Sequence, residues 1–251
     1  MEITLTTYLI VCPLVFLGGF MGAIAGGGGL ITLPAYLFAG IPIHYAIGTN
    51  KTSSVAGAVV AAFRYYRNGF VDKTILLPSI ILALTGSIIG ANVALRTSDR
   101  ILEILLLFVI PITAFYVFRN KSFGQGGGIF HQRTVVLAGI ISFGLGWYDG
   151  FYGPGTGTFL VLLYNSVAKL DIRMASGNGK MVNLASNAAA VVVFLVNGKV
   201  LIGLALVAAV FNMVGNYFGA GLVIKKGTSV VRPVLLIMLA LIFIKVGSSY
   251  L

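Results

Sequence analysis

The chain has 251 residues, of which 58% are hydrophobic and 9% are charged, and its mean hydropathy is +1.01. So little polar surface excludes a water-soluble globule, and the long, continuously apolar runs exclude the short alternating strands of an outer-membrane barrel. The net charge of +11 comes mostly from Lys and Arg in the gaps between these runs, which argues for a membrane protein and against nucleic-acid binding. We therefore predict an all-α integral membrane protein in a lipid bilayer, a polytopic bundle of about 8–10 transmembrane segments.

An internal repeat organises the chain. Aligning Gly26 with Gly155 sets one ungapped register, which also pairs Lys51 with Lys180 and Asn68-Gly69 with Asn197-Gly198. Matching glycines are common in membrane chains, but matching lysines and an Asn-Gly pair in one register are not. The repeat predicts a first transmembrane half at 1–118, a polar linker at 119–133 and a second half at 134–251.

Each predicted half contains five apolar segments. In chain order they cover roughly 8–25, 30–39, 46–65, 75–95 and 101–118, then 135–152, 159–168, 175–196, 201–224 and 230–250. The second segment of each half is short for a membrane span, so it either crosses the bilayer or re-enters it as a hairpin. Crossing leaves only Arg96, Arg100 and Lys199 on one face and gathers the other basic loop residues on the opposite face.

The gathered residues are Arg64, Arg67, Lys73, Arg119, Lys121, Arg133, Lys169, Arg173, Lys225, Lys226 and Arg232. Because re-entry would divide the basic loops nearly evenly, the positive-inside rule favours five crossings per half, with these loops in the cytoplasm and both termini outside. An odd number of crossings makes the halves inverted repeats.

Glycine-rich stretches interrupt the first apolar run of each half. Successive glycines cost about 1 kcal/mol each in a helix relative to alanine, so these stretches predict broken helices. A broken backbone next to a helix N-terminus can bind an anion, whereas isolated glycines more often allow close helix packing. The anion-binding candidates here are Gly26, Gly27, Gly28, Gly155, Thr156 and Gly157.

A lysine follows each glycine break, close to the start of an apolar helix. A lysine inside a membrane helix costs a few kcal/mol unless it reaches the surface or meets an anion. Snorkelling to the surface is the alternative, but a surface anchor need not recur with similar neighbours. We expect both lysines to act on the same anion, within a shell of hydroxyl and amide groups. This predicted site comprises Thr49, Asn50, Lys51, Ser53, Asn178, Lys180 and Asn183, with Ser54 and Asn187 nearby.

Asp149 is the one carboxylate well inside a predicted membrane segment. It is a candidate for proton coupling, although pairing with Lys180 or a place near a helix end would also explain it. His44 and His131 fall in loops without acidic neighbours at ligand spacing, so no metal site is predicted. No nucleophile and base are arranged for catalysis, and the phosphate-binding lysine motif of an ATPase is not found, so we do not expect an enzyme.

These segments resemble the sulfite exporter TauE/SafE family, and within it the YfcA-like branch. The resemblance rests on Gly22 to Pro34, Ala46 to Ser53 and Gly177 to Asn187, and it covers essentially the whole chain. It implies a multi-pass protein of the bacterial inner membrane that moves sulfite, sulfonates and related organosulfur anions without a cofactor. Asn50 precedes Lys51 where the family often has Gly-Thr-Ser-Lys, a departure that leaves the substrate open.

The sequence therefore predicts a secondary transporter of a small inorganic or organosulfur anion that works by alternating access. An anion channel would share the same lining, and a membrane scaffold or assembly protein would have no solute path. The direction of transport, the coupling ion and the formation of a homo-oligomer are left open.

Overall fold

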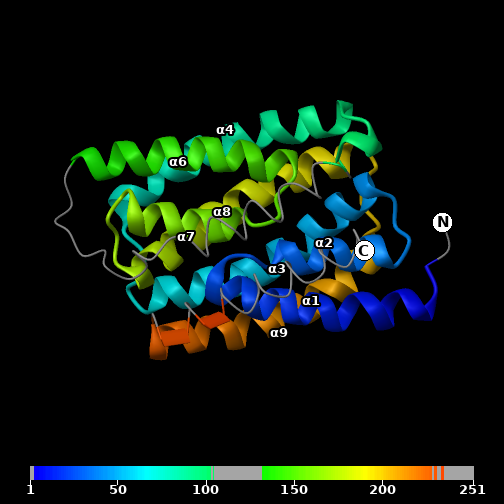
Figure 1. The fold of residues 1–251 in the computed structure, drawn as a ribbon, viewed down its shortest axis with the longest axis horizontal. Coiled ribbons are helices and arrows are strands. Elements are labelled where there is room, and N and C mark those ends of the chain that lie inside the picture. The colour runs from blue at the N-terminus through cyan, green and yellow to red at the C-terminus, as the bar shows by residue number, and fades with distance from the viewer. Residues whose placement is uncertain (1–2, 103, 105–131, 228, 231–232, 235–251) are drawn as a thin grey trace.

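The computed structural model describes residues 3–102, 104, 132–227, 229–230 and 233–234, and every regular element in these ranges is a helix (Figure 1). The helices are α1 (Leu5–Ala25), α2 (Gly29–Phe38), α3 (Ile43–Arg67), α4 (Lys73–Arg96), α6 (Gln132–Phe151), α7 (Thr156–Ser166), α8 (Ile172–Val196) and α9 (Ile202–Lys226). The predicted segments 101–118 and 230–250 lie almost entirely outside the described residues. The division into halves at the linker, also mostly outside them, stays a prediction.

Among the described helices, α1, α4, α6, α8 and α9 are long and apolar enough to cross a membrane. At 1.5 Å per residue, their 20–25 residues match a hydrocarbon core of about 30 Å. This confirms the predicted all-α, multi-pass membrane class. Helix α3 has 25 residues but is more polar, because its segment from Gly48 to Ser54 lies in the protein interior.

Close glycine contacts set the direction of the packed helices. Gly215 and Gly219 of α9 lie against the backbone around Phe16 and Phe20 of α1. The contacts follow the same order along both helices, so the helices run parallel. Gly86 and Gly90 of α4 pack in the same parallel way on α6. A Cβ at any of these glycines would overlap with the facing backbone, which explains small residues at these membrane-helix interfaces.

Helices α3 and α8 run antiparallel through the middle of the bundle. Gly48 of α3 lies beside Phe194 of α8, whereas Lys51, further along α3, contacts Asn187, which comes earlier on α8. Figure 1 shows these two helices between the α4/α6 and α1/α9 pairs.

Each short helix folds back along the helix that precedes it. Gly18 of α1 lies beside both Gly28 and Thr32, so α2 returns towards the end of the bundle at which α1 begins. Figure 1 shows α7 folded back along α6 in the same manner. The 10 residues of α2 reach about 15 Å, half of the hydrocarbon core. The short segment thus brings the chain back to its starting face, as the charge argument requires, without itself covering the full thickness.

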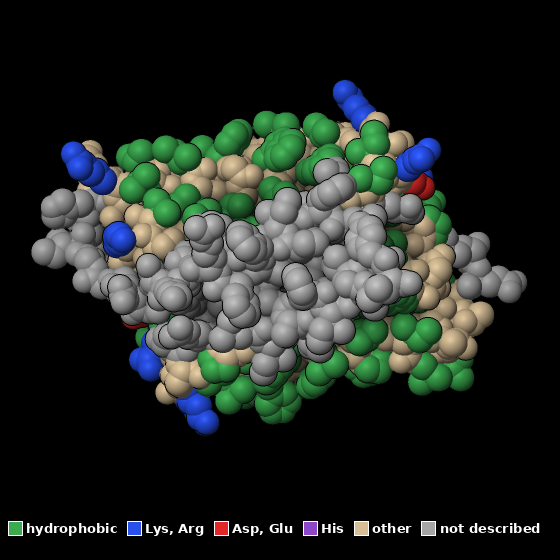
Figure 2. Space-filling view, viewed as in Figure 1, with side chains coloured by type: hydrophobic (Ala, Val, Ile, Leu, Met, Phe, Trp, Pro, Cys, Tyr) green, Lys and Arg blue, Asp and Glu red, His purple; other side chains and the backbone are tan. Residues whose placement is uncertain are grey.

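Basic residues gather at one end of the described bundle. At this end, hereafter the basic end, α3 and α9 finish and α4, α6 and α8 begin, which places there Arg64, Arg67, Lys73, Arg133, Lys169, Arg173, Lys225 and Lys226. The opposite end carries Arg96, Arg100 and Lys199. Figure 2 shows Lys and Arg at the two ends of the long axis and hydrophobic side chains between them.

The helix bounds of the two halves correspond, but not in one register. Helix α3 begins at Ile43 and α8 at Ile172, in the register that the sequence predicts. That register would pair Gly29, where α2 begins, with Thr158, but α7 begins earlier, at Thr156. The ungapped register is therefore wrong across the glycine breaks, where Gly26 corresponds to Gly153. Loops accept inserted residues easily, and repeated glycines hide such a shift in the sequence.

Candidate functional site

A cavity of about 50 Å³ lies between the two halves, at the glycine breaks. By volume it holds about three or four water molecules. Eight residues of the predicted site line it, namely Gly26, Gly28, Asn50, Lys51, Asp149, Gly157, Lys180 and Asn183. Four more lining residues belong to the predicted glycine stretches or hydrogen-bonding shell, namely Gly29, Gly153, Ser54 and Asn187. Prediction did not place Gly18, Gly19, Gly22, Thr32, Tyr152, Asn212 and Asn216 at the site. No aliphatic side chain occurs in this described lining, which is suited to a polar guest.

The remaining predicted residues, Gly27, Thr49, Ser53, Gly155, Thr156 and Asn178, do not line this cavity. Among them, Thr49 joins two helices, whereas Thr156 and Asn178 bond to backbone carbonyls three or four residues earlier. The Thr49 hydroxyl accepts the Leu201 backbone N–H at 3.0 Å, where α9 begins. The Thr156 hydroxyl donates to the Gly153 carbonyl at 2.8 Å, and the Asn178 amide donates to the Met174 carbonyl at 3.0 Å.

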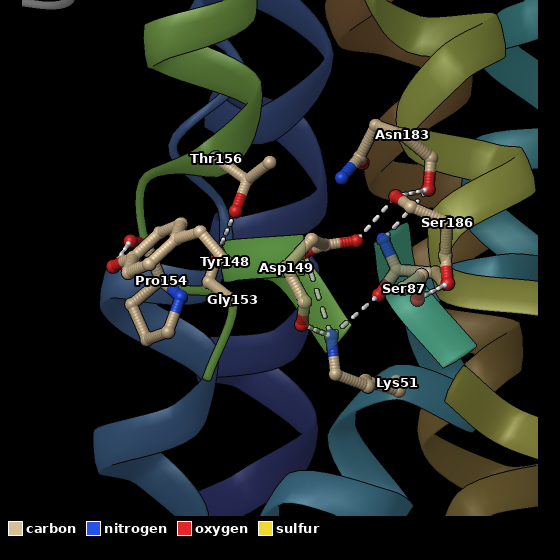
Figure 3. Close-up of polar contacts among 10 residues, drawn as sticks. Lys51, Ser87, Tyr148, Asp149, Gly153, Pro154, Thr156, Asn183 and Ser186 are labelled. Atoms are coloured by element: carbon tan, nitrogen blue, oxygen red, sulfur yellow. Dashed lines mark hydrogen bonds and ion pairs between the residues drawn. The ribbon is translucent and has the colours of Figure 1, made fainter. Parts of the chain in front are cut away.

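Lys51 lies at the centre of a buried polar network (Figure 3). Its Nζ donates to the Asp149 backbone carbonyl and lies 3.4 Å from both Asp149 Oδ1 and Asn187 Oδ1. An ammonium group has three N–H donors, so these three acceptors use all of them. The Lys51 and Asp149 side chains are each only 3% exposed, and their ion pair compensates two charges that would otherwise be costly to bury.

Asp149 connects Lys51 to helices α8 and α4. Its Oδ2 accepts a hydrogen bond from the Ser186 hydroxyl of α8. The Ser87 hydroxyl of α4 donates to the Ser186 backbone carbonyl at 2.5 Å. Figure 3 shows these groups converging from α3, α4, α6 and α8. The carboxylate thus pairs with Lys51, not with Lys180, which the sequence alone had left open.

Lys180 is the second ammonium group at the cavity, and its surroundings differ. Its Nζ donates to the Gly22 backbone carbonyl at 3.1 Å. None of the described carboxylates lies within 4.0 Å of it. The register that pairs the start of α2 with the start of α7 also pairs Gly22 with Asp149, so Gly22 takes the position of Asp149 but has no side chain to offer. Lys180 therefore has two N–H donors unused by the described residues, and none of the described carboxylates compensates its charge.

The two glycine breaks meet at the cavity. Gly26 has a φ of 80°, a left-handed conformation that favours glycine, and a Cβ on Gly26 or Gly157 would overlap with the other's backbone. The first residues of α2 and α7 therefore lie next to each other across the two halves. Gly29 and Gly157 line the cavity, so the positive ends of two helix dipoles border it.

The charges of the described lining sum to about +1, from two ammonium groups and one carboxylate. A group of three metal-ligating His, Cys, Asp or Glu side chains does not occur in the part of the chain that the structure describes. The site thus offers unused N–H donors and a positive potential, the combination that an oxyanion requires.

Asn212 and Asn216 of α9 are the residues that sequence reasoning missed most clearly. The Asn216 amide donates to the Asn212 carbonyl at 3.0 Å and to its Oδ1 at 2.7 Å, and both pack against Gly57 of α3. The signal was available, since two asparagines four residues apart share one face of an otherwise apolar helix. Polar residues in membrane helices usually face the protein interior or a water-filled path.

Comparison with known proteins agrees with this picture of a membrane bundle around a polar site. Residues 11–246 match the family model described as sulfite exporter TauE/SafE. A probable membrane transporter protein of a Sinorhizobium species is 34% identical over 89% of this chain and 85% of its own length. A probable membrane transporter protein of Haemophilus influenzae is 31% identical over 95% of this chain and 93% of its own.

The probable membrane transporter protein YfcA of Escherichia coli is 31% identical over 91% of this chain and 85% of its own length. No solved structure matches this chain. The match along nearly the whole sequence, together with the multi-pass helical fold, shows a membrane transporter and not an enzyme. The chain belongs to the sulfite exporter TauE/SafE family.

Proposed function

We propose that the protein is a secondary carrier for a small organosulfur oxyanion, such as sulfite or a short sulfonate, in the bacterial inner membrane. The observation that carries this proposal is Lys180, an ammonium group at a polar cavity with two unused N–H donors and no described carboxylate within 4.0 Å. A charged group in that setting is stabilised by an anion from solution.

Size and charge support a small monoanion. The cavity volume of about 50 Å³ accommodates a group of a few heavy atoms, such as a sulfite or sulfonate head. One negative charge would balance the lining charge of about +1. Lys180 and the helix N-termini at Gly29 and Gly157 supply donors and positive dipoles, which sulfur–oxygen groups accept well.

Alternating access is supported by the relation between the halves. Helices α3 and α8 run antiparallel, and the α1/α9 and α4/α6 pairs are each parallel, as expected for inverted repeats. Inverted halves with the site at their interface can exchange roles and so expose the cavity to either side of the membrane. An anion channel remains the alternative, and counterflow, in which external anion accelerates exit of labelled anion, distinguishes a carrier from it.

Asp149 is suited to couple the anion to a proton. The ionised Asp149 carboxylate forms an ion pair with the Lys51 ammonium group. A protonated Asp149 would no longer hold Lys51 by charge, so Lys51 could turn towards an anion in the cavity. Anion affinity then rises as the pH falls, because a second ammonium group becomes available to the anion.

The basic end is proposed to face the cytoplasm, following the positive-inside rule. Asn68 lies at this end and Ser98 at the opposite end, and both are exposed. In intact cells, a membrane-impermeant thiol reagent should label Ser98→Cys and spare Asn68→Cys, while the native Cys12 is buried. Labelling of Asn68→Cys alone would reverse the orientation.

Binding to the purified protein tests the anion site. Sulfite, thiosulfate, sulfoacetate and isethionate should bind, and acetate should bind more weakly. Lys180→Met should weaken binding by about 1.5–3 kcal/mol, roughly ten- to a hundredfold, through loss of a charge-assisted hydrogen bond. The control is Lys199→Met, which removes the same charge beside the Tyr45 ring at the opposite end. Equal affinities for both variants would remove Lys180 from the site.

A further inference from the structure

A second polar feature lies away from the transport cavity, on the outer surface between α3 and α9 at the basic end. It is a groove of about 620 Å³, within the size range of ligand pockets. Its apolar wall includes Val59, Phe63 and Tyr217, which are 49%, 57% and 52% exposed. Arg64 and Arg67 close its charged end. From Arg67 to Val59 the helix rises about 12 Å, so the wall leads from the basic end towards the middle of the membrane.

Arg64 is held in this groove by α9 and does not extend freely into water. Its Nη1 donates to the Tyr217 carbonyl at 2.6 Å, and its Cζ lies 4.1 Å from the centre of the Tyr217 ring. The guanidinium also rests on Gly221, where a Cβ would be 2.8 Å from Nη2. A guanidinium group has five N–H donors, so most of them are left for another acceptor.

Neither arginine is neutralised by a carboxylate of the part of the chain that the structure describes. No carboxylate in the described ranges lies within 4.0 Å of Arg64 or Arg67. Arg67 lies 5.5 Å from the Phe63 ring centre, one helical turn away, on the groove side of α3. Two arginine side chains thus lie at the charged end of an apolar groove on the outer surface.

The second half shows that the fold does not need these arginines. Helices α3 and α8 correspond in the register that pairs Lys51 with Lys180, which places Val193 and Val196 where α3 has Arg64 and Arg67. The corresponding part of α8 lies at the opposite end of the bundle and carries no charge. The helix packs in both halves, so the two arginines are an addition specific to the basic end.

We propose that this groove binds one anionic phospholipid, with its phosphate on Arg64 and Arg67 and an acyl chain along Val59, Phe63 and Tyr217. Paired guanidinium groups match phosphate geometry and charge, and the apolar wall gives an acyl chain a surface that inorganic phosphate cannot use. The site is distinct from the transport cavity, with which its lining shares no residue.

Native mass spectrometry of the detergent-purified protein tests the proposal by titration with phosphatidylglycerol, phosphatidylcholine or inorganic phosphate. Phosphatidylglycerol should bind more tightly than phosphatidylcholine, and phosphate should not bind measurably. Arg64→Gln/Arg67→Gln should weaken phosphatidylglycerol binding about tenfold or more, because each basic residue near a membrane surface contributes about 1 kcal/mol to attraction of anionic lipid.

The matched control is Lys225→Gln/Lys226→Gln, which removes two charges from the same end without touching the groove. This variant should keep phosphatidylglycerol binding within about twofold. A second groove variant, Val59→Trp, leaves all charges in place and should reduce lipid binding, because the larger side chain fills part of the groove. Equal binding of the two lipids, or equal losses in the arginine and lysine variants, would overturn the proposal.

Discussion

Lys51 and Lys180 occupy corresponding positions of two 25-residue helices whose bounds agree in the repeat register, yet their surroundings differ. Lys51 has three acceptors, one of them the Asp149 carboxylate, whereas Lys180 has the Gly22 carbonyl and no described carboxylate. Substitution of a single neighbour, Gly22 in one half and Asp149 in the other, accounts for the main difference. The two lysines of the predicted repeat thus have different partners.

That both lysines act on the same anion stays a prediction, and the contacts of the two lysines bear on it. Lys51 is occupied by the Asp149 carboxylate, whereas two N–H donors of Lys180 are unused by the described residues. The polar neighbours follow the same division. Ser186 donates a hydrogen bond to Asp149, and Ser87 donates one to the Ser186 carbonyl. Asn212 and Asn216 do not take part in these bonds and pack beside Gly57. Substitutions at and around the two lysines can test whether they differ in this way.

The largest effect is expected for Lys51→Met. It leaves the buried Asp149 carboxylate without its cation and should lower the free energy of unfolding by about 3–5 kcal/mol. Lys180→Met leaves no described carboxylate without its partner, so it should lower the free energy of unfolding much less. Thermal unfolding in detergent measures both, and Lys51→Met/Asp149→Asn should recover most of the lost stability. Similar losses for the two single variants, with no recovery in the double variant, would mean that the lysines are equivalent.

An intermediate effect is expected for Asp149→Asn. With the carboxylate gone, Lys51 can reach the anion in every state of the protein, so the anion dissociation constant should fall about tenfold at neutral pH, which corresponds to about 1.4 kcal/mol. The rise in affinity on acidification that we propose for the wild type should disappear, together with any dependence of transport on a proton gradient. Binding titrations at several pH values and uptake into vesicles measure these. An unchanged pH profile would leave Asp149 as a structural residue.

The smallest effect is expected for Thr49→Val, which lies two residues before Lys51. Its hydroxyl accepts the Leu201 N–H at the start of α9 and does not line the cavity, so the variant should lose about 0.5–1.5 kcal/mol of stability and keep its anion affinity. Thr52→Val is the control, because the Thr52 hydroxyl donates to the Gly48 carbonyl within the same helix and to no other described residue. A loss of affinity in Thr49→Val alone would extend the anion site beyond the two lysine environments compared here.

Much of this protein could be predicted from local properties of the chain. Long apolar runs require a membrane, and basic gaps such as Arg64 to Lys73 mark the helix ends, so the helical class and the charged end follow from residue type and spacing. The repeat of Lys51 at Lys180 also predicted which helices carry charge to the cavity. These features depend on neighbours in sequence, which a single chain displays directly.

The pairing of the charges depended on the tertiary structure. Lys51 and Asp149 are 98 residues apart, and whether they meet is decided by how α3 and α6 both pack against α8. The ungapped register set Phe20 against Asp149, whereas the fold puts Gly22 there, because a shift of two residues is hidden among repeated glycines. An ion pair forms or fails over a few ångströms, since Coulomb energy and hydrogen bonding both depend on distance and burial. Sequence spacing therefore located two lysines, and only their packing determined which of them pairs with Asp149.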